Sequence, residues 1–144
     1  MIEAGFSSPE PPAREPPART AASRAATVLL AAVWLANGLG AKLLGLVPRH
    51  QAIVARFFGD AAAPLLTRLI GVAEILMAVW IASERLPRAC AWAIAGTLVA
   101  MNSLELWRAR DLLLFPTLMP LANLGLIALA FWRSRQTPAR ARAA

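Results

Sequence analysis

Four long runs of apolar residues dominate the middle of the chain, at residues 25–47, 61–82, 87–107 and 112–132. Each run has the length of a membrane-spanning helix, since about 20 residues rising about 1.5 Å each cross a hydrocarbon core of about 30 Å. The runs lack the period-2 alternation of strands, and a helix satisfies its own backbone hydrogen bonds in lipid. The pattern therefore predicts an all-α integral membrane protein, built as a bundle of four transmembrane helices.

The connection at residues 48–60 differs from the other two, which are short turns. Its apolar residues share one helical face, and they are Ile53, Val54, Phe57 and Phe58. The preceding residues 49–51 are polar. This pattern predicts a short amphipathic helix at the membrane interface between helices 1 and 2. In the last run, Pro116 and Pro120 should bend the first half of the helix.

The two ends of the chain are polar. Residues 1–24 contain the sequence Glu-Pro-Pro-Ala-Arg twice in succession, at 10–14 and 15–19. Such a segment has too little apolar surface to offset the entropy of ordering, so we expect a disordered cytoplasmic arm, with a docking peptide as the functional alternative. Residues 133–144 should form a basic cytoplasmic tail.

Composition and charge support a membrane location. Apolar residues make up 58% of the chain, above the roughly 45–50% of soluble domains. Most of the net charge of +7 lies outside the apolar runs, which favours a membrane surface over nucleic acid as the partner. The arm, the second turn and the tail carry nine Lys and Arg residues, and the other two connections carry four. The positive-inside rule then places both termini of this multi-pass protein in the cytoplasm.

Polar residues inside the apolar runs are the candidate site. They are Asn37, Lys42, Arg68, Glu74, Asn102, Glu105 and Asn123. An ionised side chain at the bilayer centre costs about 2.5–3.5 kcal/mol, so these groups must pair, lose charge or reach water. By helical rise, three of them fall near the midplane and the other four lie about 6–12 Å towards the outer face. This convergence predicts a polar pocket for a ligand or for protons, open towards the outer side.

A purely structural interpretation stays open beside this one. Buried ion pairs can simply fix helix register, and intramembrane Asn residues commonly bridge helices. Lys42 and Glu105 lie close enough to helix ends to extend towards the headgroups. Glu74 lies too deep for that, so it must pair with Arg68 or Lys42, or be protonated.

Other residue types add little chemistry. The five tryptophans lie mostly towards the ends of the runs, as in an interfacial belt. We interpret His50 as interfacial or solvated and Cys90 as small packing. We find no catalytic residue set, no metal site and no site for a covalently bound cofactor.

Short segments in each apolar run resemble the DoxX-like family of membrane proteins. They are Trp34–Gly38 running to Lys42–Leu44, Ile70–Glu74, Met101–Leu106 leading to Asp111–Leu113, and Asn123. The likeness covers about residues 28–132. It implies a four-helix inner-membrane bundle, in a family named for a subunit of a thiosulfate:quinone oxidoreductase or terminal quinol oxidase assembly.

Three functions remain as hypotheses. The first is an accessory subunit of a quinone-linked redox system, in which the polar residues bind a quinone headgroup and a partner subunit carries the electrons. The second is a small-molecule or proton-coupled transporter, which would need a homo-oligomer because four helices make a narrow protomer. The third is a structural membrane adaptor.

Overall fold

The computed structural model describes residues 20–113, 115 and 117–136, and within this part of the chain every regular element is a helix. The elements in chain order are α1 (Ala21–Leu35), the π-helical η1 (Ala36–Leu43), α2 (Pro48–Phe58), α3 (Ala63–Ser83), α4 (Pro87–Arg108), the short 3-10 helix η2 (Arg110–Leu112) and α5 (Leu118–Gln136). The predicted all-α class is confirmed for these residues, as is the short helix between the first and second long helices.

Local chemistry sets the helix ends. The hydroxyl of Thr20 accepts a hydrogen bond from the Ser23 amide at 3.2 Å and caps α1. Pro48 and Pro87 each begin a helix, at the first position, where the missing N–H has no intrahelical partner. The turn between α3 and α4 is tight because Glu84 and Leu86 adopt left-handed conformations, with φ of 58° and 48°.

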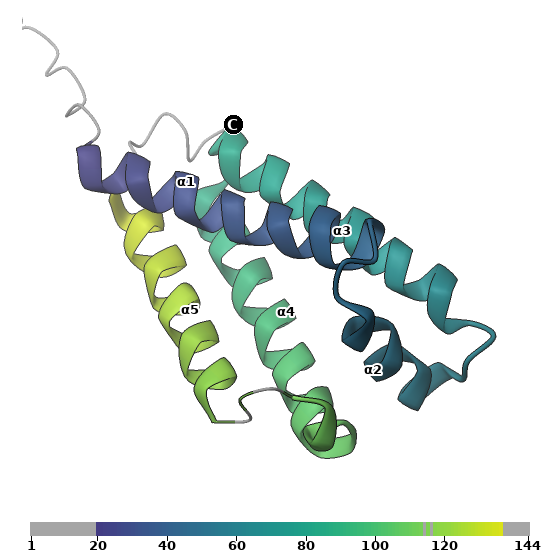
Figure 1. The fold of residues 1–144 in the computed structure, drawn as a ribbon. Coiled ribbons are helices and arrows are strands. Elements are labelled where there is room, and N and C mark those ends of the chain that lie inside the picture. Colours follow the sequence, from purple (N-terminus) through teal and green to yellow (C-terminus); the bar gives the residue numbers. More distant parts are fainter. Residues whose placement is uncertain (1–19, 114, 116, 137–144) are drawn as a thin grey trace, which may run out of the picture.

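The long helices pack as two antiparallel pairs, α1–η1 with α3 and α4 with α5 (Figure 1). The pairs meet where α1 begins and α5 ends, and they diverge from there. The short helix α2 lies at the diverging end, where it packs against η1 and α3 and also touches α4 and η2. The space between the pairs at this end is where the candidate site lies.

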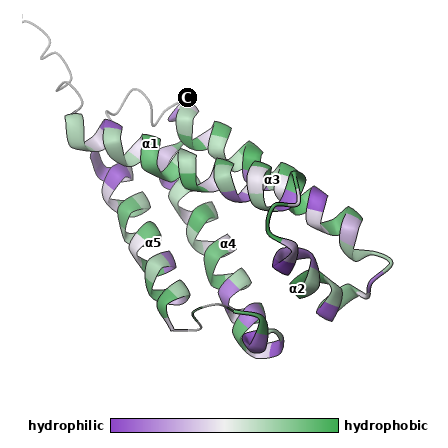
Figure 2. Cartoon of the chain, in the orientation of Figure 1, coloured by the Kyte–Doolittle hydropathy of each residue, from purple (hydrophilic) through white to green (hydrophobic). Residues whose placement is uncertain are grey.

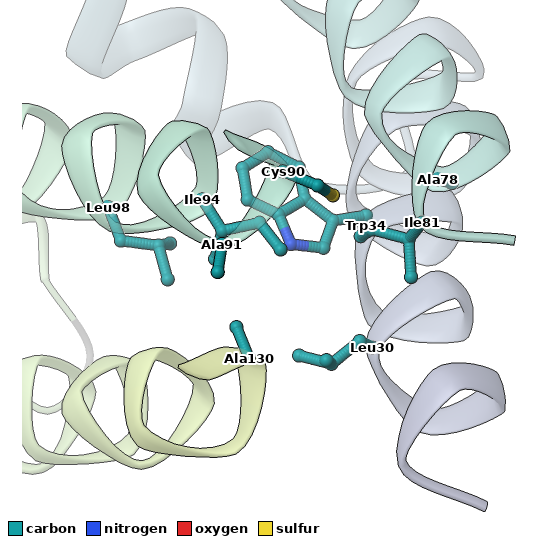
Figure 3. Close-up of a cluster of buried hydrophobic side chains, with 9 residues drawn as sticks. All are labelled: Leu30, Trp34, Ala78, Ile81, Cys90, Ala91, Ile94, Leu98 and Ala130. Carbon is teal, nitrogen blue, oxygen red and sulfur yellow. The ribbon is translucent and has the colours of Figure 1, made fainter. Parts of the chain in front are cut away.

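The hydrophobic core lies where the two pairs meet. Figure 3 shows Leu30 and Trp34 of α1 facing Ile94 and Ala91 of α4, with Ala130 of α5 beside them. Trp34 is only 4% exposed, so the prediction that it belongs to an interfacial belt is wrong. Its indole is large enough to fill the space between α1 and α4, and this packing holds it inside the protein.

A buried arginine closes the same end of the molecule. Arg133 is fully buried, and its Nη1 donates to the Ile81 carbonyl at 3.0 Å and to the Thr27 hydroxyl at 3.5 Å. The Ile81 carbonyl lies in the last turn of α3, where carbonyls lack intrahelical donors. The sequence assigns Arg133 to a solvated tail, but α5 continues to Gln136 and carries the residue into the protein. Residues 137–144 of the predicted tail lie outside the described part of the chain.

Three helices are long and apolar enough to cross a membrane among the described residues: Ala21–Leu43, Ala63–Ser83 and Pro87–Arg108. Figure 2 shows hydrophobic residues along the long helices, and hydrophilic residues on α2 and the end of α4. The apolar part of α5, residues 118–132, spans only about 22 Å at about 1.5 Å per residue. The fourth crossing that the sequence predicts is therefore not established by length and composition.

Several predicted bounds require correction. The first helix extends over Ala21–Leu43 instead of 25–47, so residues 21–24 of the predicted arm are helical, and residues 1–19 lie outside the described part. The second and third helices shift by at most two residues at either end. The last helix begins at Leu118 instead of residue 112. Pro120 thus lies in its first turn, where a missing amide donor costs little, and Pro116 lies outside the described residues.

Two glycines bring η1 and α3 into backbone contact. A Cβ added at Gly38 would lie 2.6 Å from the Gly71 carbonyl oxygen, and one added at Gly71 would lie 2.8 Å from the Gly38 oxygen. Both distances are shorter than any tolerable contact. The crossing therefore requires glycine on both helices, as in small-residue packing of membrane helices.

We expect Gly38→Ala to lower the melting temperature in detergent by several degrees, because the new methyl group forces the helices apart. Gly96→Ala in α4 is the matched control, since an added Cβ there meets nothing within 4 Å. Alanine also favours a helix over glycine by about 0.8–1 kcal/mol. Circular dichroism during heating measures both variants, and equal melting temperatures would contradict a tight crossing.

Candidate functional site

The glycine crossing positions an ion pair. Lys42 follows Gly38 by four residues on η1, and Glu74 follows Gly71 by three on α3, so each charged side chain faces the other helix. The Lys42 ammonium donates to both carboxylate oxygens of Glu74, at 2.7 and 2.8 Å. Each residue is only 5% exposed. Of the two partners predicted for Glu74, the structure selects Lys42, and the pairing holds Lys42 inside instead of letting it extend to the headgroups.

The segment that carries Lys42 is π-helical. Its wider turn closes hydrogen bonds five residues apart, and the Leu44 amide accordingly donates to the Leu39 carbonyl at 2.9 Å. Turns of this kind occur frequently at functional sites. Here the widened turn lies directly at the crossing with α3, so Lys42 is placed by local backbone geometry as well as by its partner.

A cavity of about 420 Å³ lies beside the ion pair. Side chains from α1, η1, α2, α3, α4 and α5 line it. Five of the seven predicted site residues are among them, namely Asn37, Lys42, Glu74, Glu105 and Asn123. Apolar side chains also line it, including Leu98, Met101 and Leu126. Residues of the predicted polar pocket and apolar side chains therefore line one cavity together.

Asn102 does not line the cavity itself, but it binds a residue that does. Its side-chain oxygen accepts a hydrogen bond from the Asn123 amide nitrogen at 2.8 Å. This contact joins α4 to α5 and fixes the orientation of Asn123, which lines the cavity. Asn37 is exposed, and its amide nitrogen donates to the Val33 carbonyl of its own helix at 3.0 Å. It therefore contributes to the rim of the cavity.

Arg68 does not join this group. It is exposed on α3 and does not line the cavity. Arg68 precedes Glu74 by six residues, which at 3.6 residues per turn places the two side chains about 120° apart around the helix. Depth in the membrane put Arg68 near the other charges, but its direction around the helix takes it away from them.

Two residues of α2 replace it. Arg49 and His50 line the cavity, although the sequence indicates a solvated or interfacial role for His50. They precede the buried Ile53 and Val54 by four residues and so share the inward face of α2. That spacing was visible in the sequence and could have identified both residues.

Some hydrogen-bond donors at the cavity lack acceptors. Nε and Nη1 of Arg49 and Nε1 of Trp34 are buried and have no hydrogen-bond partner among the described residues. Both side chains line the cavity. A buried donor without a partner costs about 1–3 kcal/mol, and more when it is charged. The cavity therefore presents a cationic donor and a neutral donor that are suited to acceptor oxygens.

An exposed ion pair holds α2 over the cavity. Arg56 of α2 donates from two nitrogens to the two carboxylate oxygens of Asp111, at 2.6 and 3.2 Å. These hydrogen bonds lower the pKa of Asp111 below its usual value. The Arg108 guanidinium also lies 5.8 Å from the centre of the Phe57 ring. These contacts connect α2 to the end of α4, so that Arg49 and His50 stay at the cavity.

His50 is uncharged at neutral pH. Burial lowers its pKa to about 4, and the positive charges of Lys42 and Arg49 lower it in the same direction. A neutral imidazole offers one donor and one acceptor. The α2 side of the cavity thus combines a fixed cation with a neutral group that can exchange a proton.

The comparison with known families covers this whole site. A family model described as the DoxX-like family matches residues 31–131. The chain belongs to the DoxX-like family. The resemblance drawn from the sequence segments is thereby confirmed. No curated protein and no solved structure matches the chain.

The matched region includes the candidate site, but not the residues that join the helix ends where the two helix pairs meet. Every residue lining the cavity lies within residues 31–131. Thr27 and Arg133, which join the helix ends, lie outside it. The cavity is therefore contained in the DoxX-like domain itself. Within the described residues, no group of three or more His, Cys, Asp or Glu side chains is placed to hold a metal ion.

We expect Lys42→Met to destabilise this DoxX-like protein by about 3–5 kcal/mol, because the Glu74 carboxylate is left buried without its partner. The double variant Lys42→Met/Glu74→Gln should lose much less than the sum of the two single variants. Arg56→Met at the exposed pair is the control, and it should change stability by at most about 1 kcal/mol. Denaturant unfolding in mixed micelles measures all four variants. Additive losses in the double variant would refute the coupling.

Acidification should weaken the fold through His50. Between pH 6.5 and about 4, the unfolded state takes up a proton that the folded state excludes, so stability falls as the pH falls through this window. His50→Gln removes this dependence, and we expect its melting temperature to fall less between pH 7.5 and 4.5 than that of the wild type. Parallel pH profiles of the two proteins would show that His50 is solvated.

Proposed function

We propose that this DoxX-like protein is a multi-pass inner-membrane protein that binds the headgroup of a quinone-type molecule in its cavity, as an accessory subunit of a membrane redox system. The observation that carries the proposal is the pair of unsatisfied buried donors, on Arg49 and Trp34, at one cavity. A quinone headgroup offers two carbonyl oxygens on a flat apolar ring. Such a ligand supplies acceptors to these donors without adding a charge to the site.

The size and lining of the cavity fit a ligand of this class. Its volume of about 420 Å³ falls within the range of about 300–1,000 Å³ that is usual for small-molecule sites. Leu98, Met101 and Leu126 supply an apolar surface for a ring. Arg49 and Trp34 supply directional hydrogen bonds. A strongly polar or multiply charged ligand would leave the apolar wall unmatched.

Groups that exchange protons are also at hand. Glu105 is half-buried at the cavity, and the neutral His50 lies on the α2 side. A quinone takes up two electrons and two protons when it is reduced. In this proposal the protein holds the headgroup and supplies proton-exchanging side chains, while a partner subunit carries the electrons.

The proposal includes α5 as a fourth membrane crossing, with both termini in the cytoplasm. Arg133 is buried against Ile81 and Thr27, so lipid does not meet its charge and α5 can insert as far as that residue. Its apolar part is short, and local thinning of the bilayer accommodates such a mismatch at modest cost.

Binding of a tail-less benzoquinone to the purified protein in nanodiscs tests the proposal. We expect Arg49→Gln to weaken binding by about 10- to 100-fold, since a hydrogen bond from a charged donor contributes about 1.5–3 kcal/mol. Arg68→Gln is the matched control, because Arg68 is exposed away from the cavity, and it should bind like the wild type. Equilibrium dialysis provides the dissociation constants.

Other outcomes identify the other functions. Absent binding, together with proteoliposome flux that is lost in Glu74→Gln, would support a transporter. A series in which every cavity variant alters only stability would support a structural adaptor. Quinone-dependent respiration in membranes tests the redox role directly, and unchanged respiration in Arg49→Gln at normal protein levels would remove it.

A further inference from the structure

A second cavity adjoins the first. It has a volume of about 300 Å³ and lies between α3 and α4. The two cavities share Trp34, Glu74 and Met101 in their linings, so these three side chains form a common wall. The second cavity therefore lies directly beside the proposed headgroup site.

The second cavity differs from the first in its chemistry. Apart from the shared residues, it is lined by Ile70, Ala73 and Met77 of α3 and by Thr97 of α4. Both carboxylate oxygens of Glu74 already accept hydrogen bonds from the Lys42 ammonium. They are therefore not free to bind a ligand in the second cavity. What remains is a small cavity with an almost entirely apolar surface. It offers no hydrogen-bonding set for a second polar headgroup.

The second cavity lies at the lipid-facing side of the helices. Ala73 is exposed, and Ile70, Met77 and Thr97 are half-buried. The neighbouring Val72 and Leu76 on α3 are 44% and 63% exposed. Exposed apolar side chains of this kind face acyl chains in a membrane protein. A hydrocarbon chain held here would pass directly from the protein into the bilayer.

We infer that the second cavity holds the first part of the isoprenoid tail of the ligand, which enters sideways from the lipid between α3 and α4. The inference rests on the proposed function, because it assigns the tail of the ligand whose headgroup occupies the first cavity. Trp34 is then the dividing residue. Its side chain lines both cavities, and its buried indole N–H has no acceptor among the described residues.

Filling the second cavity tests this assignment. Ala73→Trp places a large ring in the cavity, and Thr97→Phe does the same from the α4 side. We expect either variant to bind tail-less benzoquinone like the wild type and to bind an isoprenoid-tailed quinone at least tenfold more weakly. Val72→Trp is the matched control, because Val72 is the exposed neighbour of Ala73 on the same helix and does not line the cavity. It should bind both ligands normally.

A photoreactive group on the first isoprene unit provides a second measurement that needs no variant. We expect the labelled peptides of the wild type in nanodiscs to contain Ala73, Met77 or Thr97. If the tail-less quinone binds but the filled variants still bind the tailed one normally, or if the label falls on α5, the tail assignment is wrong while the proposed function stands. If neither quinone binds the wild type, the proposed function itself fails.

Discussion

In a hydrocarbon environment an ammonium and a carboxylate must meet at hydrogen-bonding distance or not be charged at all, and Lys42 and Glu74 meet this requirement only because two glycines let their helices touch. The contact between Gly38 and Gly71 sets the distance between η1 and α3. At that distance the side chains of Lys42 and Glu74 can reach each other. A well-packed apolar pair would often stabilise such a crossing equally well. Stability alone therefore does not account for charges at this position, and both residues also line the cavity that we propose as the ligand site.

The cavity in turn depends on the divergence of the two helix pairs. Where the pairs meet, small and branched side chains such as Ala91, Ile94 and Ala130 fill the space completely. Where they diverge, α2 closes part of the gap and brings Arg49 and His50 to the cavity. An exposed ion pair to Asp111, a weak type of contact in water, holds this cover. The same divergence opens the apolar cavity between α3 and α4, so one geometric feature produces both halves of the proposed ligand site.

Hydropathy predicted the helices well, because a span must be apolar over its whole length whatever it packs against. The second and third spans lie within two residues of the predicted bounds. Residue depth likewise predicted five of the cavity residues. Depth says nothing about direction around a helix, however, and that is why Arg68 was assigned to the site although it faces outward. The spacing of Arg49 and His50 from Ile53 and Val54 did carry a direction and could have added both residues to the predicted site.

Tertiary packing decided the remaining residues. The sequence could not show that Trp34 fills the core, since tryptophan near the end of an apolar run is equally typical of an interface. Nor could it show that Arg133 is buried, because its partner is a backbone carbonyl at the end of another helix, and a backbone carbonyl has no sequence signature.

The buried Arg133 and the half-buried Arg49 have different surroundings in this fold. Arg133 donates to the Ile81 carbonyl and the Thr27 hydroxyl, groups that the helix ends supply whatever the ligand. Arg49 lines the cavity, and its Nε and Nη1 have no acceptor among the described residues. Both are arginines near helix ends, and charge or hydropathy cannot separate them. Their surroundings do separate them: Nη1 of Arg133 donates to groups on two other helices, whereas Arg49 lines the cavity that we propose for the ligand.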